Sequence, residues 1–227
     1  MAARCGIAIR NANGEYLTGL DDDDYFLSNR LESFVEYIFK KKKQGIVPSL
    51  IYSNYILKRM SGEKKIKRKK YVSLNDLYFR NYVGNQAFFL KERAVAVGLF
   101  DIQMPAWQDY DFWIRLINKY GVALNTFDFT YVTDISHDHE RISSVGKIEN
   151  AYSVFVKKHF IPSERHKIFK LYLNVLVYCR DFQKFSLIDF YRYLKLVRNT
   201  EELIFVLKIG LKYFLKKMSF LNYKPVA

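Results

Sequence analysis

Four consecutive aspartates, Asp21 to Asp24, directly follow the short apolar segment 16–20. Adjacent carboxylates repel one another, so such a run needs either a compensating cation or full solvation. The apolar segment predicts a strand, and ligands of open α/β sheets bind at the carboxyl ends of strands. Hard oxygen ligands at that place suit Mg²⁺ or Mn²⁺ carrying a substrate phosphate. The alternative is an acidic turn that only precedes a helix.

A second acidic element lies in residues 108–120, which the apolar repeat and a following glycine predict to be a helix. Helical spacing places Asp109 on the same face as Trp113. A carboxylate at the edge of an aromatic face can have a raised pKa and act as a general base. Asp109 is therefore a candidate base, and the alternative is a cap in the first helical turn. Asp111 precedes Arg115 by four residues, the favoured order for a surface ion pair.

A third polar cluster spans residues 136–141 and contains His137, His139 and Arg141. Histidines separated by one residue point to opposite sides of an extended segment, which argues against both binding one ion. One of them could join a metal or a phosphate, and Arg141 could reach a diphosphate through its planar guanidinium. Taken alone, the cluster is better explained as a polar surface loop.

The elements that must position these residues alternate between helix and strand, as in a layered α/β domain. The apolar repeat after the acidic run is that of a helix packed on a sheet, with apolar residues at intervals of three and four. The expected elements are a helix at 4–13 closed by Gly14 in a left-handed conformation, a strand at 16–20, a helix from Ser28 or Asn29 that Gly45 stops, and a strand at 46–52.

Basic residues concentrate in two later regions. Residues 58–70 hold eight Lys or Arg in thirteen positions, which favours a solvated loop or arm, with an anion-binding arm as the alternative. One or two strands are expected in 122–132, and a helical pattern continues from residue 148 to the end. The final helices mix apolar residues with lysines, so they either pack on the domain or lie on an anionic membrane surface.

Composition narrows the class of protein. The chain has 227 residues, of which half are hydrophobic and 17% aromatic, so a sizeable core can form. The two cysteines give no disulfide framework and favour a reducing compartment. No apolar run has membrane-spanning length and no signal peptide opens the chain, so we expect a cytoplasmic location. The net charge of +14 favours anionic partners, namely nucleic acid, acidic lipid or polyphosphate.

Together the acidic run, the acidic helix and the polar cluster resemble, in this order, the motifs of family 2 glycosyltransferases, particularly bacterial O-antigen and lipopolysaccharide enzymes. Gly-Glu-Tyr-Leu-Thr-Gly-Leu-Asp-Asp-Asp-Asp at 14–24, followed by Asn-Arg-Leu at 29–31, resembles the central motif. Gln-Asp-Tyr-Asp-Phe-Trp-Ile-Arg-Leu at 108–116 resembles the second acidic motif, and 137–143 resembles the loop after it. The resemblance implies an α/β, Rossmann-like GT-A domain.

The expected domain organisation is a partial GT-A domain at 1–160 and a C-terminal region of amphipathic helices at 161–227. The resemblance implies inverting, metal-dependent transfer of a sugar from a nucleotide sugar, with a UDP-sugar expected. The acceptor is expected to be a lipid-linked molecule or an oligosaccharide in surface-polysaccharide assembly.

The resemblance also implies site roles. These are Asp109 as catalytic base; Asp21, Asp22 and Arg141 for the nucleotide sugar; Asp23, Asp24, His137 and His139 for Mg²⁺ or Mn²⁺. No nucleic acid is expected, and peripheral contact with the anionic inner face of the cytoplasmic membrane is expected from the C-terminal helices.

The start of the chain departs from the family pattern. Family members begin with a strand of the type Val-Ser-Ile-Ile-Ile-Pro-Thr-Tyr-Asn, and their Ala-Arg-Asn motif falls here on Arg4, Cys5 and Gly6. We therefore expect the chain to begin inside the fold, after its first strands and much of the uridine pocket. Two alternatives follow: an inactive remnant of such an enzyme, or a basic nucleic-acid-binding protein that uses residues 58–70.

Overall fold

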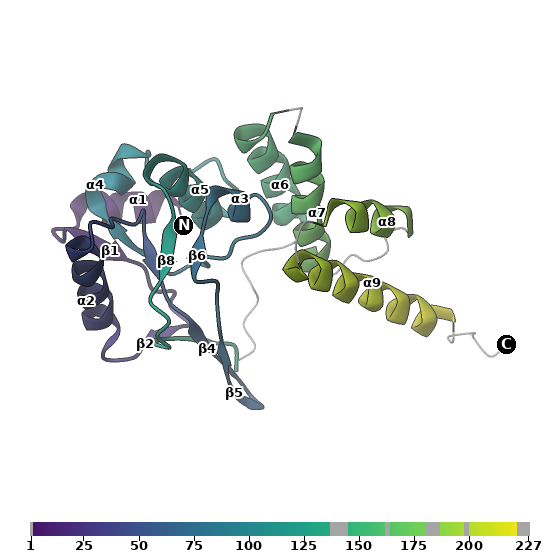
Figure 1. Cartoon of the computed structure of the whole chain (residues 1–227), viewed down its shortest axis with the longest axis horizontal. Helices are drawn as coiled ribbons and strands as arrows, with labels where there is room; N and C mark the ends of the chain where they lie inside the picture. Colours follow the sequence, from purple (N-terminus) through teal and green to yellow (C-terminus); the bar gives the residue numbers. More distant parts are fainter. Residues whose placement is uncertain (1, 137–144, 162–163, 180–186, 198–199, 222–227) are drawn as a thin grey trace. The chain divides into compact units, whose positions relative to one another are not determined.

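The computed structural model describes residues 2–136, 145–161, 164–179, 187–197 and 200–221. Contacts divide the chain into two compact units, residues 1–142 (unit 1) and 143–227 (unit 2), shown from purple to yellow in Figure 1. The acidic run and the candidate base both belong to unit 1. The family-based division at residue 160 stays a prediction.

Unit 1 contains a five-stranded mixed sheet in the order β1-β7-β3-β8-β6. Strand β7 is antiparallel to both β1 and β3, and β8 is parallel to β3. Consequently β1, β3 and β8 run in one direction, and their carboxyl ends share one edge of the sheet, here called the carboxyl edge. The strands are β1 (Tyr16–Thr18), β7 (Phe88–Leu90), β3 (Ile51–Tyr52), β8 (Ala123–Asn125) and β6 (Tyr71–Val72).

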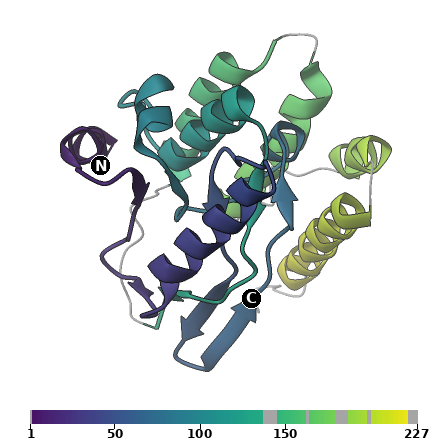
Figure 2. The ribbon, with the colours of Figure 1, turned by 60° about the vertical axis from the view of Figure 1, so that its left-hand side comes forward.

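Helices cover both faces of this sheet. Phe88 packs against Phe34, with ring centroids 5.3 Å apart, whereas Phe89 packs against Phe112 at 5.4 Å. Neighbouring strand residues point to opposite faces, so the helices that carry Phe34 and Phe112 lie on opposite sides. The first of them runs diagonally in front of the sheet in Figure 2. The helices of unit 1 are α1 (Ala2–Asn11), α2 (Arg30–Lys43), α3 (Leu74–Leu77), α4 (Lys91–Ala96) and α5 (Gln108–Tyr120).

A second sheet, in the order β2-β9-β4-β5, corrects the prediction for residues 58–70. The first part of this basic segment forms a paired hairpin instead of an irregular loop, although most of β5 is exposed, as a solvated arm requires. Strand β4 also pairs with β9. Lysine suits these strands because its ammonium can lie over an aromatic ring, as Lys65 does over Phe129 at 5.3 Å. The strands are β2 (Tyr25–Phe26), β9 (Tyr131–Asp134), β4 (Tyr55–Arg59) and β5 (Gly62–Ile66).

Glycines end two of the predicted helices as expected, but not the first. Gly45, with φ of 72°, follows the C-cap residue of α2, and Gly121, with φ of 88°, directly follows the end of α5. Helix α1 instead ends at Asn11, whose side-chain amide donates to the carbonyl oxygen of Ile7 at 3.1 Å. Gly14 lies beyond that end and has no positive φ, so its predicted role as a left-handed cap is wrong.

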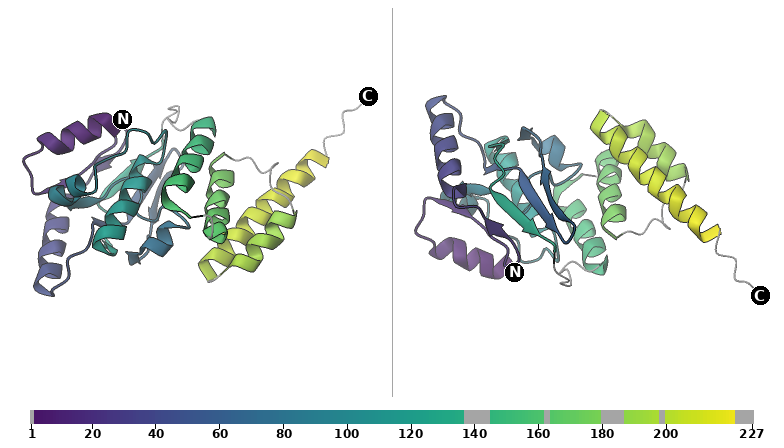
Figure 3. Two further views of the ribbon diagram at one scale, coloured as in Figure 1. Left: turned by 90° about the horizontal axis from the view of Figure 1, so that it is seen from above. Right: turned by 90° about the horizontal axis from the view of Figure 1, so that it is seen from below.

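Unit 2 is helical, and its consecutive helices pack in pairs from α6 to α9 (Figure 3). Its core includes Tyr193, Val206 and Ile209. One face of α9 is therefore packed within unit 2, while several of its leucines remain exposed. Packing of these helices on the GT-A domain stays a prediction. Within the described part of the chain, every helix is too short or too polar to span a bilayer. The helices are α6 (Val145–His159), α7 (Arg165–Cys179), α8 (Leu187–Leu196) and α9 (Thr200–Leu221).

Candidate functional site

The acidic run follows β1 at the carboxyl edge, where the sequence predicts it. A tight turn brings the run together, since the amide of Asp24 donates to the carbonyl oxygen of Asp21 at 3.2 Å. One carboxylate oxygen from each of Asp21, Asp23 and Asp24 lies within 4.8 Å of the others. Asp22 is exposed and lies outside this cluster. Three converging hard oxygens are a ligand set that fits Mg²⁺ or Mn²⁺.

Asp24 anchors the acidic run to the second sheet. One of its carboxylate oxygens accepts a hydrogen bond from the Tyr131 hydroxyl, and the other accepts from the amide of Asp134 at 3.0 Å. Burial raises the pKa of Asp24, while these two hydrogen bonds oppose the rise. Asp24 therefore has a structural role in this position, and Asp23 is the exposed member of the cluster.

Asp21 is held from the other side by the loop that precedes β7. The side-chain amide of Asn85 donates to its carboxylate, and Gln86 adds a second hydrogen bond. Because β7 is antiparallel to β1, the residues before β7 arrive at the same edge as those after β1. Burial raises the pKa of Asp21, and the nearby charges of Asp24 and Asp23 raise it further.

Asp109 lies in the first turn of α5. The residue that caps this helix is Trp107, whose φ of 62° and ψ of 27° are left-handed, so Asp109 is not the N-cap itself. Its carboxylate accepts from the Asn81 amide at 3.1 Å. Burial raises the pKa of Asp109 to about 6, the hydrogen bonds from Tyr110 and Asn81 oppose the rise, and the charge of Asp21 adds to it. Such a pKa suits a general base that works near neutral pH.

The predicted ion pair between Asp111 and Arg115 exists, but it is not at the surface. Asp111 is fully buried, and Arg115 donates to one of its oxygens through Nε at 3.0 Å and Nη2 at 2.7 Å. Arg115 also donates to the carbonyl oxygen of Leu99 at 2.6 Å. The pair therefore links α5 to the loop after α4, which the local spacing of the sequence does not reveal.

The loop at 81–86 connects the acidic run to Asp109. The amide of Gly84 donates to Asn81 Oδ1 at 3.0 Å, and the indole of Trp113 donates to the carbonyl oxygen of Gly84 at 2.7 Å. Gly84 has φ of 80°, and a Cβ there would lie 2.4 Å from the guanidinium of Arg68. This φ favours glycine, and a side chain there would also require the Arg68 guanidinium to shift.

Sequence reasoning missed the residues of this loop as part of the site. The available signal was the cluster of amide side chains, Asn81, Asn85 and Gln86, in an otherwise aromatic segment.

Arg30 belongs to the Asn-Arg-Leu motif, but its buried contacts could not be predicted from the sequence. It is 1% exposed and donates through Nη1 to the hydroxyls of Ser53 at 2.9 Å and Thr130 at 3.2 Å. Its guanidinium also lies over the ring of Phe34 at 4.3 Å and that of Tyr131 at 5.1 Å. Burial lowers the pKa of Arg30 to about 10. This buried cation supports Tyr131, which in turn holds Asp24.

The histidines and the arginine of the predicted polar cluster are not part of the described structure. His137, His139 and Arg141 all fall in residues 137–144, which lie outside the described residues. Their assigned contacts with metal or diphosphate stay predictions.

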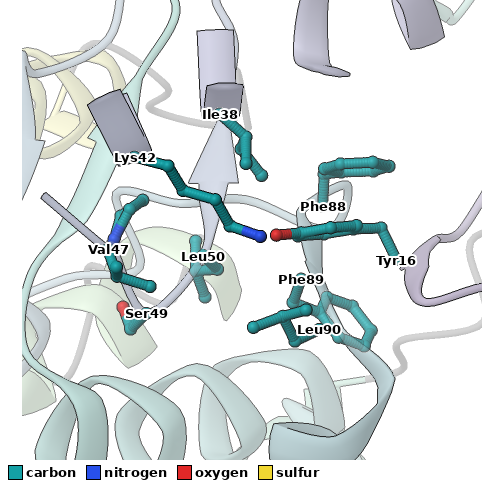
Figure 4. A pocket seen from close by; sticks show the side chains of 10 residues that line it. Tyr16, Ile38, Lys42, Val47, Ser49, Leu50, Phe88, Phe89 and Leu90 are labelled. Atoms are coloured by element: carbon teal, nitrogen blue, oxygen red, sulfur yellow. The ribbon is translucent and has the colours of Figure 1, made fainter. Parts of the chain in front are cut away.

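A small pocket lies beside Tyr16, the first residue of β1 (Figure 4). The acidic run follows the last residue of this strand. Lys42 extends from α2 toward the hydroxyl of Tyr16 in this view. The pocket lining contains no carboxylate. The lining residues are Tyr16, Ile38, Lys42, Val47, Pro48, Ser49, Leu50, Phe88, Phe89 and Leu90.

Comparison with known proteins finds similarity to glycosyltransferases. Residues 2–96 match glycosyl transferase family 2. The chain is 32% identical over 174 residues to a putative colanic acid biosynthesis glycosyl transferase, WcaA, of Escherichia coli K12, a match covering 73% of this chain and 61% of that protein. It is 26% identical over 165 residues to the uncharacterized glycosyltransferase MJ1057 of Methanocaldococcus jannaschii, covering 70% and 55%. The chain thus spans only about three fifths of these relatives' length.

Solved structures agree on the fold. The crystal structure of S. aureus TarS 1–349 superposes with a TM-score of 0.55 at 11% identity, over 83% of this chain and 56% of that one. A second TarS structure gives a TM-score of 0.51 at 12% identity, over 81% and 33%. At these identities the likeness concerns the fold alone, and with the family match it confirms the predicted α/β GT-A class. The family match includes the acidic run and the loop at 81–86 but ends before Asp109.

Proposed function

Because residues 2–96 of this chain belong to glycosyl transferase family 2, we propose that the protein transfers a sugar from a nucleotide sugar, first of all a UDP-sugar, to an oligosaccharide or lipid-linked acceptor. The observation that carries the proposal is that the acidic run and Asp109 lie close together at the carboxyl edge. Asp21 and Asp109 are close enough for the charge of one to raise the pKa of the other. The similarity to a putative colanic acid glycosyl transferase supports an acceptor in surface-polysaccharide assembly.

The acidic run is the proposed donor and metal site. Exposed Asp23 offers the most accessible oxygens, with Asp24 beside it, while Asp21 and Asp22 contact the nucleotide sugar. A divalent ion held there would offset the charge that builds on the departing diphosphate. Residues 137–143 resemble the loop after the second acidic motif of family 2 glycosyltransferases. This resemblance supports the further assignment of His137 and His139 to the metal and of Arg141 to the diphosphate.

Asp109 is the proposed catalytic base. With a pKa of about 6 it is ionised at neutral pH and can accept a proton from the acceptor hydroxyl. As that proton leaves, the hydroxyl oxygen forms a bond to the anomeric carbon, and the bond from that carbon to the diphosphate oxygen breaks. The attacking and leaving oxygens lie on opposite sides of the carbon, so the configuration inverts.

The donor site can be tested through the two tryptophans, because Trp113 contacts the loop at 81–86 and Trp107 caps the helix of the base. UDP or a UDP-sugar with Mn²⁺ should change their fluorescence, and Asp23→Asn should abolish the change. Glu36→Gln, which removes an exposed carboxylate of α2, is the matched control and should bind normally. Unchanged wild-type fluorescence together with no heat in calorimetry would reject the proposal. Binding to unrelated DNA duplexes that falls steeply with salt would favour the nucleic-acid alternative.

Helix α9 is the proposed contact with an anionic membrane surface. The opposite face from its packed residues exposes Leu207 and Leu211, and Lys208 beside them is also exposed. An exposed apolar stripe bordered by lysine is the pattern of helices that lie in the lipid headgroup region. This contact would bring the enzyme close to a lipid-linked acceptor.

A further inference from the structure

We propose that Asn81 is a positioning residue for Asp109, and that the loop at 81–86 fixes the position of Asp109 relative to Asp21. The inference rests on the proposed function for its kinetic consequences. The geometry behind it, however, is independent of which sugar or acceptor is used.

The first step is that both ends of the Asn81 amide are engaged. Its Nδ2 donates to Asp109 Oδ2 at 3.1 Å, and its Oδ1 accepts from the amide of Gly84 at 3.0 Å. A backbone amide can only donate, so the atom facing Gly84 must be the side-chain oxygen. The NH₂ group is thereby directed to Asp109, and the orientation of the donor follows from the loop.

The second step is that the loop is tied back to the helix that carries the base. Trp113, one turn after Asp109 on α5, donates to the carbonyl oxygen of Gly84. Asn81 and Gly84 therefore each contact α5, which closes a ring of hydrogen bonds between loop and helix. Arg68 adds a bond to the carbonyl oxygen of Val83 and packs directly against Gly84.

The third step is that the same short loop reaches the donor site. Asn85 follows Gly84 and donates to the Asp21 carboxylate. The base and the nucleotide-sugar end of the acidic run are thus held by side chains only four positions apart in the chain. A shift of the loop would change the position of both, and correct placement of reacting groups is a large part of catalysis.

The charges around Asp109 define what a change at position 81 can do. The carboxylate of Asp21 faces it from the acidic run, and the backbone amides of Asp109 and Tyr110 donate to it. Arg80 and Tyr82 act on the neighbouring Tyr110 hydroxyl. Among the residues that the structure describes, Asn81 supplies the one side-chain hydrogen bond that ranks with the main influences on Asp109.

The decisive variant is Asn81→Asp, because it keeps an oxygen for Gly84 and replaces the donor by a carboxylate oxygen. We expect kcat to fall about 10- to 100-fold while KM for the nucleotide sugar changes less than about twofold. The acid limb of the rate profile should move to higher pH, because a second negative charge disfavours ionisation of Asp109. Asn13→Asp, the same change at an exposed position before β1, should have neither effect.

A second measurement does not depend on activity. Carboxyl ¹³C NMR titration, with Asp109 assigned through Asp109→Asn, should give a higher pKa of Asp109 in both Asn81→Asp and Asn81→Ala than in the unmodified chain. The Ala variant keeps the test available if the Asp variant does not fold. Absence of transfer with the expected NMR shift would reject the proposed function alone. Titration of Asp109 that is the same in all three proteins would overturn the role of Asn81.

Discussion

The side chain of Asn85 donates a hydrogen bond to the carboxylate of Asp21, although 64 positions separate them in the chain. The contact arises because β7 runs antiparallel to β1, which brings the residues before one strand to those after the other. The same loop places Asn81 on Asp109. A single segment without any catalytic group therefore relates the proposed donor site to the proposed base.

Removal of this contact should weaken donor binding. Asn85→Ala deletes a hydrogen bond that opposes the raised pKa of Asp21, so the pKa of this carboxyl should rise further and its ionised form should be less favoured as the pH falls. We expect the calorimetric Kd for UDP with Mn²⁺ to rise about 5- to 10-fold at pH 6 and by less at pH 8. Asn13→Ala is the control, at an exposed position distant from the carboxyl edge. An unchanged Kd at both pH values would contradict this role of Asn85.

Asp109 should reduce stability at neutral pH. Burial raises its pKa from 3.8 to about 6, so between these values the native state binds more protons than the unfolded state. Stability therefore falls as pH rises through this window and stays lower above it. After discounting for partial exposure, Asp109→Asn should stabilise the protein by about 1 to 2 kcal/mol at pH 7.5 while abolishing transfer.

Urea unfolding of both proteins at pH 4 and pH 7.5 tests this expectation. The difference in free energy of unfolding should nearly vanish at pH 4, where Asp109 is largely protonated in the native state. A stability difference that is equal at both pH values would show that the ionisation of Asp109 is not its cause.

Tight packing of α8 on α9 depends on Gly210. A Cβ at this position would lie 2.4 Å from the ring of Phe190. Gly210→Ala should therefore destabilise unit 2 by about 1 to 3 kcal/mol through overpacking. Gly146→Ala in α6 is the matched control, since nothing lies within 4 Å of the added carbon and alanine favours the helix by up to about 1 kcal/mol. Thermal unfolding followed by circular dichroism should separate the two variants in opposite directions.

The sequence predicted those parts of the site that local patterns determine. Helix α5 and the position of the acidic run follow from short-range periodicity and from the rule that ligands bind at the carboxyl ends of strands. The contacts of Asp24 with Tyr131 and of Asp109 with Asn81 join distant segments, and no local spacing encodes them.

The same reason explains the wrong predictions. The basic segment at 58–70 becomes a hairpin because β9, far along the chain, supplies a pairing strand. Asp111 is buried, and its partner Arg115 also donates to a carbonyl oxygen of another loop, which spacing on one helix cannot indicate. Gly14 was interpreted from its residue type alone, whereas α1 ends earlier at Asn11.

The exposed face of α9 should govern membrane contact. Leu207 and Leu211 are 47% and 60% exposed and lie one turn apart, so replacing both with Gln should leave the packed core of unit 2 intact. Loss of their apolar burial should reduce cosedimentation with phosphatidylglycerol vesicles at least several-fold. Ile102→Gln, at a 72% exposed position of unit 1, controls for surface hydrophobicity in general. Equal vesicle binding by all three proteins, or no binding by the unmodified chain, would exclude this face as the lipid contact.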